Sequence, residues 1–350
     1  MKALLKIALP SLIFFFACDS YDPSKMPALE DYGNEQLKAI NILTQKYPRT
    51  STNYYEKARI LWEIDKRKES LSSIAKAVEM NESQGEYHLF LAQAFLENDS
   101  VKAAFNSAKK AETLGLDTLA LQELLTNLYT KEKQYPEAML NIDKVLVKEP
   151  QNASFHLKKG QIALALKDQT MAESSLLRTL ELDPETVDAS KSLADIYLQR
   201  DDYQKALIYI DQNLKKNPKD ADFLYKKGYA LKETGNRPEA ANMFRATIKE
   251  DQQYASAYSQ LGMIWLRLGR TDSARYYARS ARAIDNQDKE ALLTLARVAD
   301  RKKGYYVALE HYNQILAMDS TYVPAVTEKK KLMGKIKWLQ YLAKQKAGGN

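Results

Sequence analysis

Residues 188–220 read DASKSLADIYLQRDDYQKALIYIDQNLKKNPKD, and this stretch decides the fold. Apolar residues recur in it at helical spacing, first around Leu193 and Tyr197 and then around Ile210. Asp201 and Asp202 separate the two apolar runs, and an Asn-Pro pair closes the second run, where proline stops a helix. The pattern predicts two antiparallel helices joined by a tight turn.

The same pattern repeats every 34 residues from Ser51, without insertion or deletion. The repeats are 51–84, 85–118, 119–152, 153–186, 187–220, 221–254, 255–288 and 289–322. The eighth place of each repeat holds a small residue, namely Ala58, Ala92, Thr126, Gly160, Ala194, Gly228, Gly262 and Ala296. The twentieth place does so too, with Ser70, Ala104, Ala138, Ala172, Ala206, Ala240, Ala274 and Ala308. Antiparallel helices approach closely only where their facing side chains are small, so we expect these residues between the helices.

Prolines mark the helix boundaries. Three of them stand two residues before the end of a repeat, where they end the second helix: Pro150, Pro184 and Pro218. Asn286 and Ser320 take this place in the last two repeats, so the pattern leaves open that the second helices there run on. Pro136 and Pro238 stand where the second helices of their repeats begin, because the missing N–H costs little there.

This pattern resembles the tetratricopeptide repeat, a helix-turn-helix of 34 residues. Within 187–220 the resemblance is carried by L-A-x-x-Y, Y-x-x-A and N-P at the family's offsets. It implies an all-α fold, an α-solenoid of about eight repeats over residues 51–322. Residues 33–50 resemble an N-terminal capping helix, and 323–350 a C-terminal capping helix and tail. In the latter, four side chains are expected to face the preceding repeat: Leu332, Ile336, Leu339 and Leu342. Lysine replaces the family's leucine at the seventh place in Lys57, Lys159 and Lys227, whose stems can pack while the ammonium reaches water.

Residues 1–17 are predicted to be an export signal. Lys2 and Lys6 precede an apolar run that ends at Ala17 and is shorter than the roughly 20 residues that span a bilayer. Ala17-Cys18 resembles the lipobox of bacterial lipoproteins, which implies that Cys18, the only cysteine, carries acyl chains such as palmitate. Residues 18–32 are then the lipidated cysteine and a flexible tether. Two alternatives remain open: plain secretion after a cut behind Ser20, and an uncleaved chain with a buried cysteine.

The sequence offers no catalytic motif, and we expect neither an enzyme nor a cofactor. It contains no HExxH, GxSxG or Walker-type loop and no nucleophilic Cys–His pair. His88 and His156 occupy the same place two repeats apart, so they cannot converge on a metal. We expect these two and His311 to be core or partly buried residues, and we predict no metal site.

The resemblance also points to a binding surface. In the family the first helices line the concave face, with the second, fifth, ninth, twelfth and thirteenth places inward. From the fifth and ninth places we take as candidate partner-binding residues Tyr55, Arg59, Leu89, Gln93, Asn127, Leu157, Gln161, Lys191, Asp195, Tyr225, Tyr229, Met263 and Arg297. Such a mixed surface suits an extended peptide or a partner helix. The alternative is that several of these side chains pack between adjacent helices. The Lys–Asn pair with which some relatives bind C-terminal carboxylates is not matched, because Asp195 follows Lys191 and Glu123 precedes Asn127.

Two basic features remain. Arg275, Arg279 and Arg282 share one helical face beside Tyr276 and Tyr277. Residues 323–346 hold seven lysines and one glutamate. Export makes nucleic acid a poor partner, whereas anionic lipid headgroups, cell-wall polymers or an acidic protein would fit. A merely solvated face is the alternative.

Together these observations predict a non-catalytic scaffold or adaptor that is lipid-anchored in the bacterial cell envelope. It would face the periplasm or the cell surface, and we favour the outer over the inner membrane. Its partners would be proteins of an envelope complex for secretion, outer-membrane assembly or cell-wall work. The alternative function is a lipoprotein that captures peptides or glycans.

Overall fold

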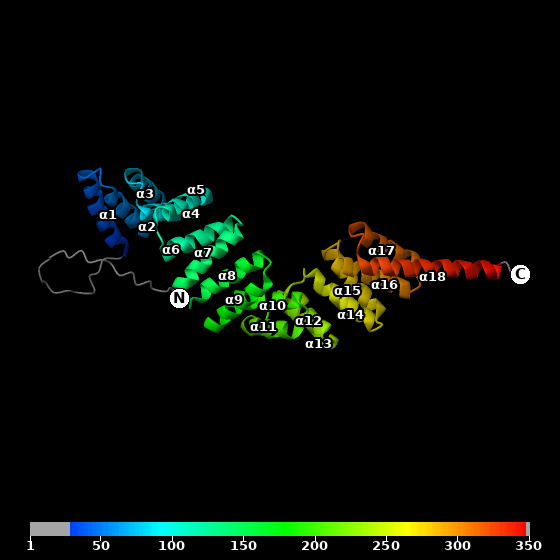
Figure 1. Cartoon of the computed structure of the whole chain (residues 1–350). Coiled ribbons are helices and arrows are strands. Elements are labelled where there is room, and N and C mark those ends of the chain that lie inside the picture. The colour runs from blue at the N-terminus through cyan, green and yellow to red at the C-terminus, as the bar shows by residue number, and fades with distance from the viewer. Residues whose placement is uncertain (1–28, 348–350) are drawn as a thin grey trace. The chain divides into compact units, whose positions relative to one another are not determined.

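The structure is a computed structural model that describes residues 29–347, all of whose regular elements are helices (Figure 1). The first helices of the eight repeats are α2 (Ser51–Glu63), α4 (Gly85–Glu97), α6 (Leu119–Lys131), α8 (Ala153–Ala165), α10 (Val187–Gln199), α12 (Ala221–Glu233), α14 (Ala255–Arg267) and α16 (Lys289–Arg301). The second helices are α3 (Arg67–Met80), α5 (Val101–Thr113), α7 (Tyr135–Lys148), α9 (Gln169–Leu182), α11 (Tyr203–Lys216), α13 (Arg237–Glu250), α15 (Thr271–Ile284) and α17 (Tyr305–Met318). The predicted all-α fold of paired helices is confirmed. The export signal, Cys18 and most of the tether lie outside the described residues.

The chain forms two compact units, with the division between Gln134 and Tyr135. In the first unit, α3 packs on α4 and α5 on α6, so each second helix contacts the first helix of the next repeat. In the second unit the same contacts join α7 to α8 and continue in this order to α15 and α16. Each unit therefore buries its helices by stacking neighbouring repeats, because no single helix pair can enclose a core.

The small residues of the eighth and twentieth places, which we call the small-residue slots, are all buried. A Cβ atom on Gly160 would stand 2.8 Å from Leu176, and one on Gly228 would stand 2.8 Å from the ring of Phe244. In the first repeat the Ser70 hydroxyl donates a hydrogen bond of 2.7 Å to the carbonyl of Ala58, so the two slots touch. The predicted reason for small residues at these places is confirmed.

A left-handed residue turns the chain inside every repeat. The fifteenth places hold Asp65, Asp99, Lys133, Lys167, Asp201, Gly235, Gly269 and Lys303, all with φ between 53° and 93°. The amide after this residue returns to the first helix, as where Asp202 N donates to the Tyr197 carbonyl at 2.9 Å. This is a helix C-cap that satisfies carbonyls left open at the helix end.

The second helices of the last two repeats do not run on. They end at Ile284 and Met318, at the thirtieth place, as in the repeats that carry proline. The next residue stops each helix: the Asp285 carboxylate accepts the Gln287 amide at 2.9 Å, and the Asp319 carboxylate accepts the Thr321 amide at 3.1 Å. Such an Asx turn competes with the helical hydrogen bonds, and proline is not required.

A further helix stands at either end. α1 (Leu29–Lys46) packs on α2 and begins four residues before the expected cap at 33. α18 (Val323–Ala347) packs on α17, and its Leu332 and Ile336 join the cluster around Tyr312. Leu339 and Leu342 are half-buried and Trp338 is 59% exposed, so α18 packs mainly through its first half.

Candidate functional site

The candidate site is the first-helix surface, which we define as the fifth, ninth and twelfth places of the repeats. Of the thirteen predicted residues, Gln161 is exposed and the other twelve are half-buried. Half-burial means that each of these side chains packs on a neighbour while part of it still reaches solvent. The neighbouring side chains therefore determine which part of each candidate residue stays exposed to a partner.

In the first unit, aromatic rings join α2 to α4. Tyr55 stacks on Tyr87, with ring centroids 4.8 Å apart, and meets Phe90 edge-on at 5.9 Å. Trp62 also meets Phe90 edge-on, at 5.5 Å. The Arg59 guanidinium pairs with Glu56 of its own helix at 3.3 Å. Tyr55 therefore holds two first helices together.

A cavity of about 520 Å³ opens on this surface beside Trp62. Its lining residues come from the three first helices of the unit and the turn after α4: Trp62, Gln93, Leu96, Glu97, Asp99 and Leu124. Gln93 is the one predicted candidate among them. Trp62 and Leu96 share the twelfth place, which the resemblance had marked as inward, so the sequence contained the signal for them.

In the second unit, Lys191 and Asp195 of α10 both reach α12. The Lys191 ammonium lies 5.5 Å from the ring centroid of Phe223, and the Asp195 carboxylate pairs with Lys226 at 2.7 Å. Both contacts link a first helix to the next first helix. The charges of the two candidate residues are thus already used within the chain.

A polar chain crosses α12, α14 and α16. Lys232 donates to the Gln260 side chain at 2.9 Å, and Gln260 donates to Glu290 at 2.8 Å. Glu290 is half-buried, and this burial raises the pKa of its carboxyl group. The twelfth place supplies Lys232 and the second place Glu290, so both lie at inward places that the resemblance had marked.

Tyrosines flank this polar chain. Tyr225 lies between Phe244 and Tyr254, at centroid distances of 5.5 and 4.9 Å, and burial raises its pKa to about 12. Tyr229 lies 6.3 Å from Tyr203. Met263 lines a separate cavity of about 170 Å³ together with Lys232.

At the end of the second unit, Arg297 holds α18. Its guanidinium makes three hydrogen bonds to the Glu328 carboxylate, at 2.6 to 3.1 Å, and the Tyr312 hydroxyl donates to the same carboxylate at 2.9 Å. Burial raises the pKa of Glu328, but the bonds from Arg297 and Tyr312 outweigh it, and the net pKa is lowered. Arg297 therefore acts as an internal anchor for the capping helix.

The alternative that candidate residues pack between adjacent helices thus describes Tyr55, Asp195, Tyr225 and Arg297. Gln93 and Met263 instead line cavities, and Gln161 is exposed. These three are the candidate residues best placed to reach a partner.

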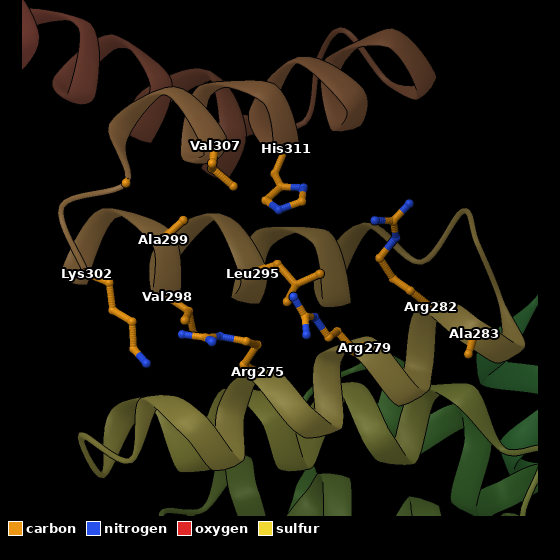
Figure 2. Close-up of a pocket in the computed structure, with 11 residues that line it drawn as sticks. Arg275, Arg279, Arg282, Ala283, Leu295, Val298, Ala299, Lys302, Val307 and His311 are labelled. Carbon is orange, nitrogen blue, oxygen red and sulfur yellow. The ribbon is translucent and has the colours of Figure 1, made fainter.

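The three histidines have two kinds of surroundings. His88 is buried and His156 half-buried, and the Nε2 atom of each meets a carbonyl six residues earlier, at 2.9 and 3.0 Å. His311 lines a cavity between α15, α16 and α17, and so do Arg275, Arg279 and Arg282 (Figure 2).

Within residues 29–347, no three His, Cys, Asp or Glu side chains gather as a metal ion would require. Of the helices in that range, none combines the length and apolar character needed to cross a bilayer.

Comparisons with known proteins place these features in a family. A family model described as tetratricopeptide repeat matches residues 55–115, 170–221 and 225–289, which is more than half of the chain. A second model with the same description matches residues 153–186.

Curated proteins show a more distant likeness. The chain is 25% identical to protein O-mannosyl-transferase TMTC1 of Homo sapiens over 224 residues, which are 62% of this chain and 24% of the relative. It is 23% identical over 141 residues to anaphase-promoting complex subunit 3 of Schizosaccharomyces pombe, covering 40% of this chain and 21% of the relative. The chain thus covers less than a quarter of the length of these relatives.

Among solved structures, PilF of Pseudomonas aeruginosa superposes with a TM-score of 0.51 at 13% identity. The superposition covers 60% of this chain and 97% of PilF. At this identity the likeness concerns the fold alone.

Proposed function

The chain belongs to the tetratricopeptide repeat family, and from this premise we propose that it is a non-catalytic scaffold that binds segments of partner proteins. Proteins of this family generally bind protein partners, on the extended surface that their stacked repeats present. The observation that carries the proposal is the cavity beside Trp62, where an indole, the Gln93 amide and the Leu96 side chain converge.

This cavity has the composition of a peptide-binding site. Tryptophan and leucine offer an apolar wall for one anchoring side chain, and the Gln93 amide offers a donor and an acceptor to a peptide backbone. Partner binding at such a place concentrates on a few large buried side chains, with tryptophan prominent among them. We therefore assign Trp62 as the main anchor and Gln93 as the group that aligns the bound segment.

The proposal that the chain is not an enzyme rests on its side chains. Its perturbed groups are accounted for by structure: Glu290 lies in a polar chain between first helices, and Glu328 holds the capping helix. The relative TMTC1 is named as a transferase, but this chain covers only 24% of it. Reproducible turnover of peptides, glycans or esters by the purified chain, abolished by a point mutation, would contradict the proposal.

We further propose that the scaffold is a lipoprotein of the bacterial envelope, anchored through Cys18 and serving an envelope complex. The support is the sequence of the first 20 residues, with two lysines, an apolar run and Ala17-Cys18. Two or three acyl chains anchor a protein stably, since each buried CH₂ contributes about 0.8 kcal/mol, whereas one chain binds reversibly. The Cys18→Ser variant should therefore leave the membrane fraction of cells, and unchanged membrane attachment would contradict lipidation at this residue.

Site-specific photo-crosslinking in cells tests the binding surface. A photoreactive amino acid at Gln93 should give a discrete crosslinked partner, and the same amino acid at the exposed Glu79 of α3 serves as the control. The additional change Trp62→Ala should reduce the Gln93 crosslink at least five-fold without changing the amount of folded protein. Equal crosslinking from Gln93 and Glu79, or no effect of Trp62→Ala, would contradict the assignment of this surface.

A further inference from the structure

A second cavity, of about 520 Å³, lies between α15, α16 and α17 (Figure 2). On α16 it is lined by Leu295, Val298 and Ala299, about half a turn around the helix from Leu293 and Arg297 of the fifth and ninth places. It therefore opens away from the first-helix surface.

At this cavity the eleventh place of the last repeat holds Ala299. At three earlier places a large ring from the eleventh place fills the space against the preceding second helix. Tyr129 meets Phe105 edge-on at 5.0 Å, and the Tyr197 hydroxyl donates to Glu173 at 2.6 Å. Trp265 lies beneath the Arg245 guanidinium, 5.5 Å from the ring centroid. The methyl group of Ala299 leaves this volume open, whereas Ala163 at the same place of the fourth repeat is fully buried.

The contact between α15 and α16 also lacks the ion pair that joins a second helix to the next first helix in two other repeats. In two other places a lysine of the seventh place pairs with an aspartate of the preceding twenty-fifth place: Lys159 with Asp143 and Lys227 with Asp211, both at 2.8 Å. In the last repeat the seventh place is Leu295 and the preceding twenty-fifth place is Arg279. The internal ion pair is thus replaced by an arginine beside an apolar wall.

The cavity is strongly cationic. Four of its lining residues are Arg275, Arg279, Arg282 and Lys302, and none of its lining residues is acidic. Asp272 pairs with Lys302 at 2.6 Å and with Arg275 at 3.7 Å. No carboxylate in the described part of the chain pairs with Arg279 or Arg282. Like charges this close repel one another unless an anion joins them.

Two buried nitrogen atoms at the cavity have no hydrogen-bond partner among the described residues, namely Nε of Arg282 and Nδ1 of His311. Unpaired buried polar atoms are rare in proteins, because each costs about 1–3 kcal/mol. One of them is a cationic donor, and both stand at a cavity without a carboxylate. A ligand with acceptor oxygens would satisfy Nε of Arg282, and Nδ1 of His311 in the tautomer that carries its proton there.

We propose that this cavity binds an acidic, extended segment of a partner protein. Carboxylates on one face of the segment would meet Arg279 and Arg282 of α15, and an aliphatic side chain on its opposite face would lie on Leu295 and Val298 of α16. The three arginines of α15 are spread over about 10 Å of helix, which is more than one small anion can bridge. Carboxylates on alternate residues of an extended chain stand about 7 Å apart and match that spread. The site lies apart from the first-helix surface, so it stands or falls independently of the proposed function.

Fluorescence anisotropy with the purified chain and a labelled peptide Gly-Glu-Leu-Glu-Leu-Glu-Gly tests this proposal. The double variant Arg279→Gln/Arg282→Gln should lower the affinity at least ten-fold, as should replacing the three glutamates of the peptide by glutamines. Ala299→Trp should have a similar effect while all charges remain, because the indole would fill the cavity as Trp265 does one repeat earlier. Thermal unfolding of each variant separates loss of binding from loss of the fold.

Arg245→Gln is the matched control. Arg245 occupies the twenty-fifth place one repeat earlier, but its guanidinium donates to Asn242 and lies over Trp265. Its replacement should change the peptide affinity less than two-fold. Binding that survives both Ala299→Trp and the double arginine variant, or no binding at millimolar peptide, would overturn the proposal. So would arginine-dependent binding to phosphatidylglycerol vesicles or inorganic phosphate without binding of the peptide.

His311 gives a second readout that a structural role of the arginines would not produce. Burial lowers the pKa of its imidazole, Arg282 and Arg279 lower it further, and Gln314 and Glu310 act in the opposite direction. Lys302 of α16 lines the same cavity. Bound carboxylates oppose these cations, so the peptide should raise the pKa of His311 in an NMR titration. An unchanged pKa at saturating peptide would overturn binding at this cavity.

Discussion

The small-residue slots and the first-helix surface are built from the same helices and obey different constraints. At the slots, sixteen of sixteen side chains are small and buried. At the fifth and ninth places the residue type changes from repeat to repeat, from Tyr55 to Lys191 to Met263. The residue size at the slots is limited by the distance between two helix backbones, whereas the surface residues need only fit the few side chains beside them.

This difference shows which residues of a repeat protein determine the fold and which can change to alter what the protein binds. A side chain in a slot cannot become large, because the helices pair closely there. A side chain on the first-helix surface can serve as a link between helices, as Tyr225 does, or line a cavity, as Gln93 does. The following predictions test how far these two classes differ.

The largest effect is expected from Gly228→Leu. Even a Cβ atom here would stand 2.8 Å from the Phe244 ring, so a leucine must push α12 and α13 apart. We expect the free energy of unfolding to fall by about 3 kcal/mol, measured by urea unfolding. Gly262→Ala is the control, because its Cβ would meet atoms no closer than 3.4 Å. A small effect of Gly228→Leu would mean that the slots tolerate volume and that the comparison is wrong.

A smaller loss is expected from Arg297→Ala, the ninth-place residue that acts structurally. The change removes three hydrogen bonds to Glu328 and leaves that carboxylate with Tyr312. We expect a loss of about 1.5 kcal/mol, because hydrogen bonds to charged groups contribute on this scale. Hydrogen exchange should show faster opening of α18 than of α12. If exchange in α18 did not change, Arg297 would belong with the variable surface residues.

The hydrogen bond between Glu173 and Tyr197 is expected to contribute less to stability than the Arg297 contacts and more than the Gln161 side chain. The hydrogen bond from the Tyr197 hydroxyl holds the pKa of Glu173 below its ordinary value of 4.5, and Arg200 lowers it further. A carboxylate with a lowered folded pKa stabilises the fold above about pH 4.5, and this contribution is lost as the pH falls through the folded pKa.

Glu173→Gln should therefore cost less than about 1 kcal/mol at neutral pH and flatten the loss of stability in acid. Urea unfolding at a series of pH values measures both effects. Glu181→Gln, which removes an exposed ion pair on the same helix, is the control and should leave the acid dependence nearly unchanged. Parallel pH curves for Glu173→Gln and the wild type would contradict the role of this bond.

The smallest effect on stability is expected from Gln161→Ala. Its side chain is exposed at the ninth place, so the free energy of unfolding should change by less than about 0.5 kcal/mol. Thermal unfolding measures this change. A larger loss would show that an exposed residue of the first-helix surface is also structural.

The period and the slots made the fold predictable from sequence. Small residues at two fixed places define which helix faces meet, and prolines mark the ends of three second helices and the starts of two. The ends at Ile284 and Met318 were missed because Asp285 and Asp319 stop the helix by a local side-chain hydrogen bond that the proline pattern does not include.

The site was predictable only in part. The places that face inward follow from the repeat, but which of their residues reach solvent depends on neighbours one repeat away, as with Asp195 and Lys226. The arginine face of α15 was visible in the sequence. Its cavity was not, because alanine at the eleventh place does not by itself predict one: Ala299 lines a cavity, whereas Ala163 at the same place is fully buried.

The left-handed turn residues are positions at which substitution would raise the thermal stability of the chain. Six of the eight are aspartate or lysine, for which this backbone conformation is strained, while Gly235 and Gly269 adopt it without strain. Converting Lys133 and Lys167 to glycine relieves strain of up to about 1 kcal/mol each, at turns that line neither proposed binding cavity. The protein could thus be stabilised first, and its binding surfaces could then be redesigned for another partner.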